Sequence, residues 1–96
     1  MAAGDVVSGI STTNSIDFQP ASGVECMISC INGSDANYLY LKITDGVTVS
    51  TSRFTNNNSF IANNGANIKV FINNTNYLNV TAGAGYPVSY TGVQTK

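Results

Sequence analysis

The chain has 96 residues, of which 43% are hydrophobic and only 9% are charged, and its formal net charge is −1. A chain of this length forms one domain with a modest core. The low charge excludes a basic surface for a nucleic-acid backbone. No apolar run approaches the roughly 18 residues that a membrane-spanning helix needs. Histidine, the commonest general base and metal ligand, is absent.

The N-terminal segment differs in composition from the remainder of the chain. It contains Gly, Ser, Thr and Asn but few large apolar residues. We therefore expect residues 1–14 to be a flexible or extended arm and residues 15–96 to be a single β-domain. The first five residues carry no positive charge and no apolar stretch, so we expect no secretory signal.

Along the chain, short runs of β-branched and aromatic residues recur about every ten residues, and no window has helical spacing. This pattern predicts an all-β fold, namely an antiparallel β-sandwich of eight or nine short strands with no significant helix. A jelly roll is one form that such a sandwich takes. The expected strands are Val6–Ile10, which is weak, Ser15–Phe18, Val24–Ile31, Tyr38–Thr44, Val47–Phe54, Ser59–Ala62, Ile68–Ile72, Tyr77–Thr81 and Pro87–Val93.

Two cysteines lie four residues apart in the strand predicted over Val24–Ile31. Strict alternation places Cys26 and Cys30 on one face, roughly 13 Å apart. That separation is too long for a disulfide, whose Cα atoms lie within about 7 Å. We expect two buried, reduced thiols and no metal site, since the sequence offers no further cysteine or histidine as a ligand.

The clearest turn is Asp45-Gly46, between the predicted strands Tyr38–Thr44 and Val47–Phe54. A two-residue turn sets apolar residues against polar partners. A three-residue loop over Thr44–Gly46 instead pairs Ile43 with Val47 and Leu41 with Val49, with Gly46 in the left-handed conformation. Burial favours this second register.

A second hairpin is predicted between Ile68–Ile72 and Tyr77–Thr81, with Asn73–Asn76 as its loop. Alternation then points one set of side chains inward and the other outward. The expected inward residues are Ile68, Val70, Ile72, Leu78 and Val80, and the expected outward residues are Lys69, Phe71, Tyr77 and Asn79.

No arrangement of residues indicates a catalytic, metal or cofactor site. Without histidine, a nucleophile would need Lys, Asp or Glu as its base, and the acids fall singly along the chain. We expect no enzyme activity, no cofactor and no metal. All five acids lie in the first half, and three of the four basic residues lie in the second. Two explanations of this division are open. It is a chance result among nine charges, or it gives opposite signs to edges that meet in an assembly.

Several aromatic residues fall outside the predicted core: Tyr38, Tyr40, Phe71, Tyr77, Tyr86 and Tyr90. Such residues serve as surface cover, as a subunit or capsid interface, where tyrosine is enriched, or as a platform on which sugars stack. The absence of tryptophan weakens the last interpretation.

The stretch Ser15–Glu25, the alternating strand after it and the segment Tyr38–Gly46 are similar to small all-β virion proteins of tailed bacteriophages. These are the head decoration (cement) proteins and the related fibre-head domains. The similarity covers Ser15–Val93 and is one of style and length, so it carries over no functional residue. It implies a protein that binds as an oligomer, often a trimer, between capsomers on the outside of a capsid.

Composition and resemblance together lead us to expect a structural protein of a phage particle. Its partners would be the major capsid protein and other copies of itself, with a trimer favoured over a dimer, and no nucleic acid or membrane. It would assemble in the host cytoplasm and remain in the virion. The alternative is a tail, fibre or adhesin domain that binds a carbohydrate of the host surface.

Overall fold

The fold is seen in a computed structural model, which describes residues 2–33, 39–53, 64–83 and 85–96. Within these ranges the regular elements are all strands, as the sequence predicts. They are β1 (Val6–Ser11), β2 (Ser15–Phe18), β3 (Glu25–Gly33), β4 (Leu39–Thr44), β5 (Val49–Arg53), β6 (Asn64–Asn73), β7 (Tyr77–Ala82) and β8 (Val88–Gln94). The strand expected over Ser59–Ala62 lies outside the described residues.

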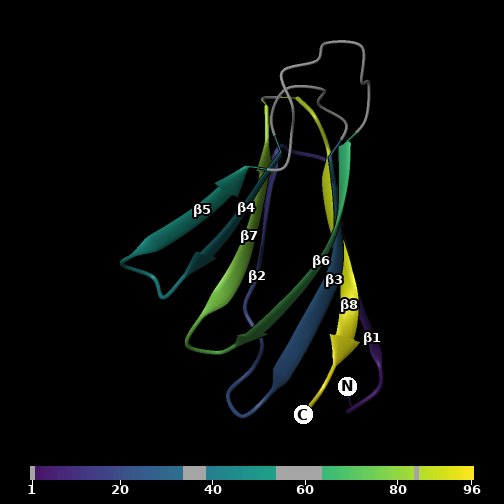
Figure 1. The fold of residues 1–96 in the computed structure, drawn as a ribbon, viewed down its shortest axis with the longest axis vertical. Helices are drawn as coiled ribbons and strands as arrows, with labels where there is room; N and C mark the ends of the chain where they lie inside the picture. Colours follow the sequence, from purple (N-terminus) through teal and green to yellow (C-terminus); the bar gives the residue numbers. More distant parts are fainter. Residues whose placement is uncertain (1, 34–38, 54–63, 84) are drawn as a thin grey trace.

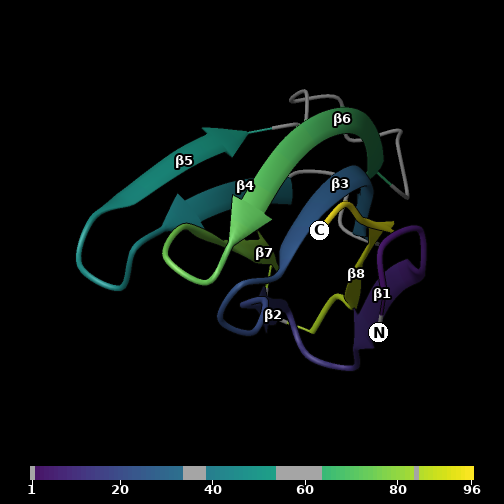
Figure 2. The ribbon, with the colours of Figure 1, turned by 90° about the horizontal axis from the view of Figure 1, so that it is seen from below.

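The eight strands form two four-stranded antiparallel sheets, ordered β1-β8-β3-β6 and β2-β7-β4-β5 (Figures 1 and 2). We call them sheet A and sheet B. The pairs β1–β8, β2–β7, β3–β6 and β4–β5 are nested, as if one long hairpin had been wound into a sandwich. This is the strand order of a jelly roll. The predicted β-sandwich is therefore confirmed.

The core lies between the two sheets and follows the alternation of the strands. In β7 and β8 every second residue is buried, in agreement with the period of two. The buried hydrophobic residues are Val7, Cys26, Ile28, Ile31, Leu39, Leu41, Ile72, Leu78, Val80, Ala82, Val88 and Tyr90, and Ile16, Phe18, Val24, Ile43, Ile68 and Val70 pack against them. The inward residues predicted for Ile68–Ile72 and Tyr77–Thr81 are all in this set.

A β-bulge in β3 corrects the prediction for the cysteines. The register of β3 with both β6 and β8 shifts between Ile28 and Cys30. The extra residue reverses the alternation, so that Ile31 enters the core and Cys30 turns away from it. Both thiols are free, as expected, but only Cys26 is buried.

The hairpin at Asp45-Gly46 exists, but its predicted register is wrong. Thr44 pairs with Val49 and Ile43 pairs with Ser50, which leaves a four-residue loop over Asp45–Thr48. The Asp45 side chain accepts hydrogen bonds from the backbone N–H groups of Val47 and Thr48, at 2.9 and 2.7 Å, and so closes the longer loop. Gly46 is left-handed, with φ of 95°, as predicted.

The consequence of this register is that β5 adds little to the core. Val47 is 91% exposed and Val49 is 55% exposed. The residues of β5 that share the inward face of β4 are Ser50 and Ser52, opposite Ile43 and Leu41. The register therefore follows the hydrogen bonds of the loop and not the burial of Val47 and Val49.

The predicted hairpin between β6 and β7 is also wrong. β6 pairs with β3 in sheet A, whereas β7 pairs with β2 and β4 in sheet B. The connection through Asn74, Thr75 and Asn76 therefore crosses from one sheet to the other. Its turn has the same chemistry as the Asp45 loop, since the side chain of Asn73 accepts hydrogen bonds from the N–H groups of Thr75 and Asn76.

The interpretation of residues 1–14 as an arm does not match the structure. Val6–Ser11 forms β1, which pairs along its whole length with β8 and places Val7 in the core. Asn14 also extends the pairing of β2 with β7, because its carbonyl accepts a hydrogen bond from the N–H of Ala82. Val7 is the buried hydrophobic residue of β1, so this strand is held in the sheet mainly by its pairing with β8.

Candidate interaction surfaces

The ionisable residues that the structure describes are spread over the molecule. Among them, no group of three or more Cys, Asp or Glu residues is arranged to hold a metal ion. No helix in the described ranges is long and apolar enough to cross a membrane. The features that remain as candidate sites are one small hollow and the outer faces of the two sheets.

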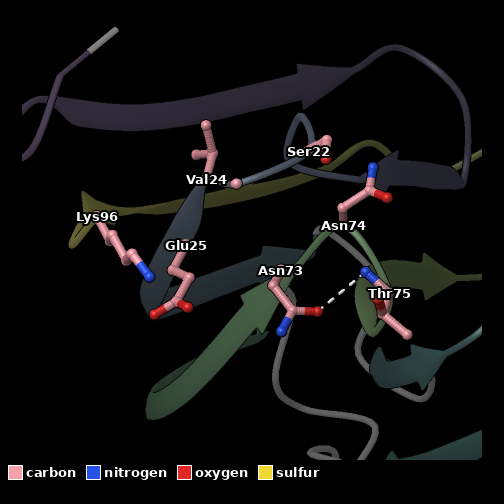
Figure 3. A pocket seen from close by; sticks show the side chains of 8 residues that line it. Ser22, Val24, Glu25, Asn73, Asn74, Thr75 and Lys96 are labelled. Carbon is pink, nitrogen blue, oxygen red and sulfur yellow. Dashed lines mark hydrogen bonds between the residues drawn. The ribbon is translucent and has the colours of Figure 1, made fainter.

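The small hollow lies at the end of the sandwich where β3 begins and β6 ends, and its volume is about 200 Å³ (Figure 3). Two connections border it and are hydrogen-bonded together. The Gln19 side chain donates to the carbonyl of Asn74 at 2.8 Å, and the Asn74 side chain donates to the carbonyl of Pro20 at 3.0 Å. Glu25 and Lys96 reach the hollow from one side (Figure 3). These contacts hold the two connections together. We therefore interpret the hollow as a consequence of how the chain packs and not as a binding site.

The outer face of sheet A carries an apolar stripe that crosses all four strands. Val6 on β1 is opposite Val93 on β8, Val93 is opposite Met27 on β3, and Met27 is opposite Phe71 on β6. We call these four residues the apolar row. Val6 is 72% exposed and Phe71 is 65% exposed, while Met27 and Val93 are half-buried. Contiguous exposed apolar residues of this kind mark surfaces that contact other molecules.

Two exposed charges lie on opposite sides of the apolar row. Glu25 precedes Met27 by two residues on β3, and Lys69 precedes Phe71 by two residues on β6. Because β3 and β6 are antiparallel, one charge lies beyond each long side of the row. The row is therefore apolar along its length, with Glu25 beyond one long side and Lys69 beyond the other.

The outer face of sheet B is polar. A shallow groove of about 410 Å³ is lined by Ser15 and Asp17 of β2, Asn79 and Thr81 of β7, Lys42 and Thr44 of β4, and Val49. We call it the polar groove. The Asn79 amide donates to Asp17 Oδ1 at 2.6 Å and to Ser15 Oγ at 3.0 Å, and it accepts from Thr81 Oγ1. Hydrogen bonds therefore fix the side chains in the centre of this groove.

The aromatic residues that the sequence places outside the core have different positions in the structure. Phe71 and Tyr86 are exposed, as expected, and Tyr40 and Tyr77 are half-buried. Tyr90 corrects the prediction, because its ring lies in the core against Phe18. Tyr38 lies outside the described residues.

No protein-family model and no curated protein matches this sequence. The candidate surfaces are therefore argued from their own chemistry. Sequence reasoning found Phe71 but missed the other members of the apolar row. No local signal could have joined them, because Val6 and Val93 meet only through the pairing of the first strand with the last.

Proposed function

We propose that this chain is a structural protein that works by packing against other protein chains, and specifically a decoration protein of a bacteriophage capsid. The observation that carries the proposal is the apolar row. Phe71 and Val6 are mostly exposed in a protein with very few charges. Contact with a protein surface would remove both side chains from water, which stabilises association by roughly 25 cal/mol for each Å² of apolar area buried.

The edge strand β1 supports the same proposal. β1 lies at the edge of sheet A, contains no charged residue, and exposes Ile10 in addition to Val6. Free sheet edges are usually guarded by charged residues or proline, which prevent unwanted pairing. An edge without this protection suits a protein whose neighbours cover it. Jelly rolls form capsid and lectin domains, although the fold alone assigns neither role.

The copy number in purified particles tests this proposal. The expected result is that the chain is present in hundreds of copies per particle, as measured by gel densitometry against the major capsid protein. Purified chain should also bind in a saturable way to shells that lack it, and these shells should then resist heating better. A handful of copies per particle, or no binding to shells, would contradict the proposed role.

The polar groove favours a second candidate function, which is the binding of a neutral saccharide of a host surface. Hydrogen-bonded Asp and Asn side chains beside Ser and Thr hydroxyls are suited to sugar hydroxyl groups, and Val49 offers an apolar wall. A glycan array with the labelled chain tests this role. Asn79→Ala should abolish any signal, and Asn76→Ala, which changes an exposed residue outside the groove, should not.

A further inference from the structure

We propose that the outer face of sheet A binds a second copy of this chain, with a two-fold axis that runs along the apolar row. This inference rests on the proposed function insofar as both require the row to contact protein, and it adds the partner and the geometry. It assigns a two-fold contact, whereas the resemblance to decoration proteins implied a trimer.

The apolar residues fit such an axis. Rotation by 180° about a line in the sheet surface, perpendicular to the strands, brings each residue on that line opposite itself. Phe71 would then face Phe71 of the second copy, and Met27, Val93 and Val6 would do the same. The strand register places all four residues on one line across the sheet. In the dimer, each of the four side chains would therefore be covered by an apolar partner.

The flanking charges decide between this axis and the alternative. Glu25 and Lys69 lie about 7 Å to either side of the row, on neighbouring strands about 4.8 Å apart. Rotation about the row exchanges the two sides, so Glu25 of each copy comes beside Lys69 of the other. A two-fold axis parallel to the strands would keep Glu25 and Lys69 on their own sides and would form no such pair. Charge complementarity therefore selects the axis along the row.

The size of the contact predicts its strength. The row and the two flanking rows, at about 7 Å spacing across four strands at about 4.8 Å spacing, cover on the order of 400 Å² per copy. That is about half of a standard interface, so we expect a weak dimer. A weak contact becomes effective when many copies are held on one repeating surface, because each neighbour is then present at a high local concentration.

Sedimentation velocity of the purified chain, from about 5 to 500 µM, tests the dimer in the absence of any shell. The expected result is a shift from monomer to dimer over this range. Phe71→Ser should raise the dissociation constant of the dimer about tenfold or more, because Phe71 of one copy packs against Phe71 of the other on the axis. The control is Val47→Ser, since Val47 is an apolar residue even more exposed than Phe71 but lies in the loop before β5. Circular dichroism confirms that each variant keeps its fold.

A charge exchange tests the axis. Glu25→Lys alone and Lys69→Glu alone should each weaken the dimer, and the two together should restore it. A monomer at every concentration, or a dimer that Phe71→Ser leaves unchanged, overturns the inference. A dimer in which the double exchange fails to restore association overturns the axis. Binding to shells by a chain that stays monomeric would reject the dimer and leave the proposed function standing.

Discussion

The ring of Tyr90 on β8 lies almost parallel to the ring of Phe18 on β2, with centroids 5.0 Å apart and planes inclined by 13°. The pair joins the two sheets across the core, because β8 belongs to sheet A and β2 to sheet B. Gly9 on β1 is directly opposite Tyr90 and leaves space for its ring. The stacked pair therefore depends on a glycine in the neighbouring strand.

A side chain at Gly9 is expected to displace this ring. A Cβ atom there would lie 2.6 Å from Cε2 of Tyr90, which is too close for a carbon contact. Gly9→Ala should therefore lower the free energy of unfolding by about 1–3 kcal/mol, as overpacking of a core does. Urea denaturation measures the change. Ser8→Ala, at the exposed neighbouring position, is the control and should change stability by less than about 0.5 kcal/mol.

Gly92 should tolerate a side chain even less. It lies opposite Ile28, next to the bulge in β3, and an added Cβ would overlap the carbonyl oxygen of Met27. A backbone atom inside a sheet cannot move aside as the ring of Tyr90 can. We expect Gly92→Ala to cost more than about 3 kcal/mol or to prevent folding. A melting curve for Gly92→Ala that matches that of Gly9→Ala would show that the strands separate easily at the bulge.

The loop after β4 should resist a β-branched residue at Gly46. Its φ of 95° lies in the left-handed region, where L-residues are strained. Gly46→Val should cost roughly 1–2 kcal/mol, whereas Gly46→Asn should cost less because asparagine tolerates this region. Thermal melting distinguishes the two variants. If Gly46→Val melts within a degree of the unchanged chain, the loop conformation is wrong.

The hydrogen-bonded carboxylate of Asp45 is expected to make the protein less stable in acid. Hydrogen bonds from the backbone N–H groups of Thr48 and Val47 hold the pKa of its carboxyl below the ordinary value. Because the folded pKa is lower than the unfolded value of about 3.9, this stabilisation is present above that pH and is lost as the pH falls through the folded pKa. Melting temperatures between pH 5 and pH 2 should fall less steeply for Asp45→Asn, which keeps the acceptor oxygen and does not ionise. Equal slopes would contradict the role of Asp45.

The two thiols should react at different rates. Cys26 is fully buried and burial raises its pKa, whereas Cys30 is half-buried on the other side of β3. An alkylating reagent should therefore label Cys30 first in the native protein, since the thiolate is the reactive form. Mass spectrometry of digested samples measures the order, and both sites should react alike in denaturant. Equal labelling of the native protein would contradict the bulge.

The sequence alone predicted the eight strands that the structure describes, although not all of their bounds, and predicted which side chains of most of these strands face inward. Alternation with a period of two is a property of neighbouring residues, so Ile72, Leu78 and Val80 could be assigned to the core without knowledge of their partners. The turn residues Asp45 and Asn73 were equally local, because their side chains bond to the backbone two and three residues later.

Only the tertiary structure decided how the strands combine. The turns at Asp45 and Asn73 use the same hydrogen bonds, yet the first joins neighbours in one sheet and the second crosses between sheets. The bulge that turns Cys30 outward and the pairing that sets Val6 beside Val93 likewise depend on strands far apart in the chain. These choices minimise the free energy of the whole sandwich, because each strand must match one or two neighbours and the core at once, and no short window of sequence contains that information.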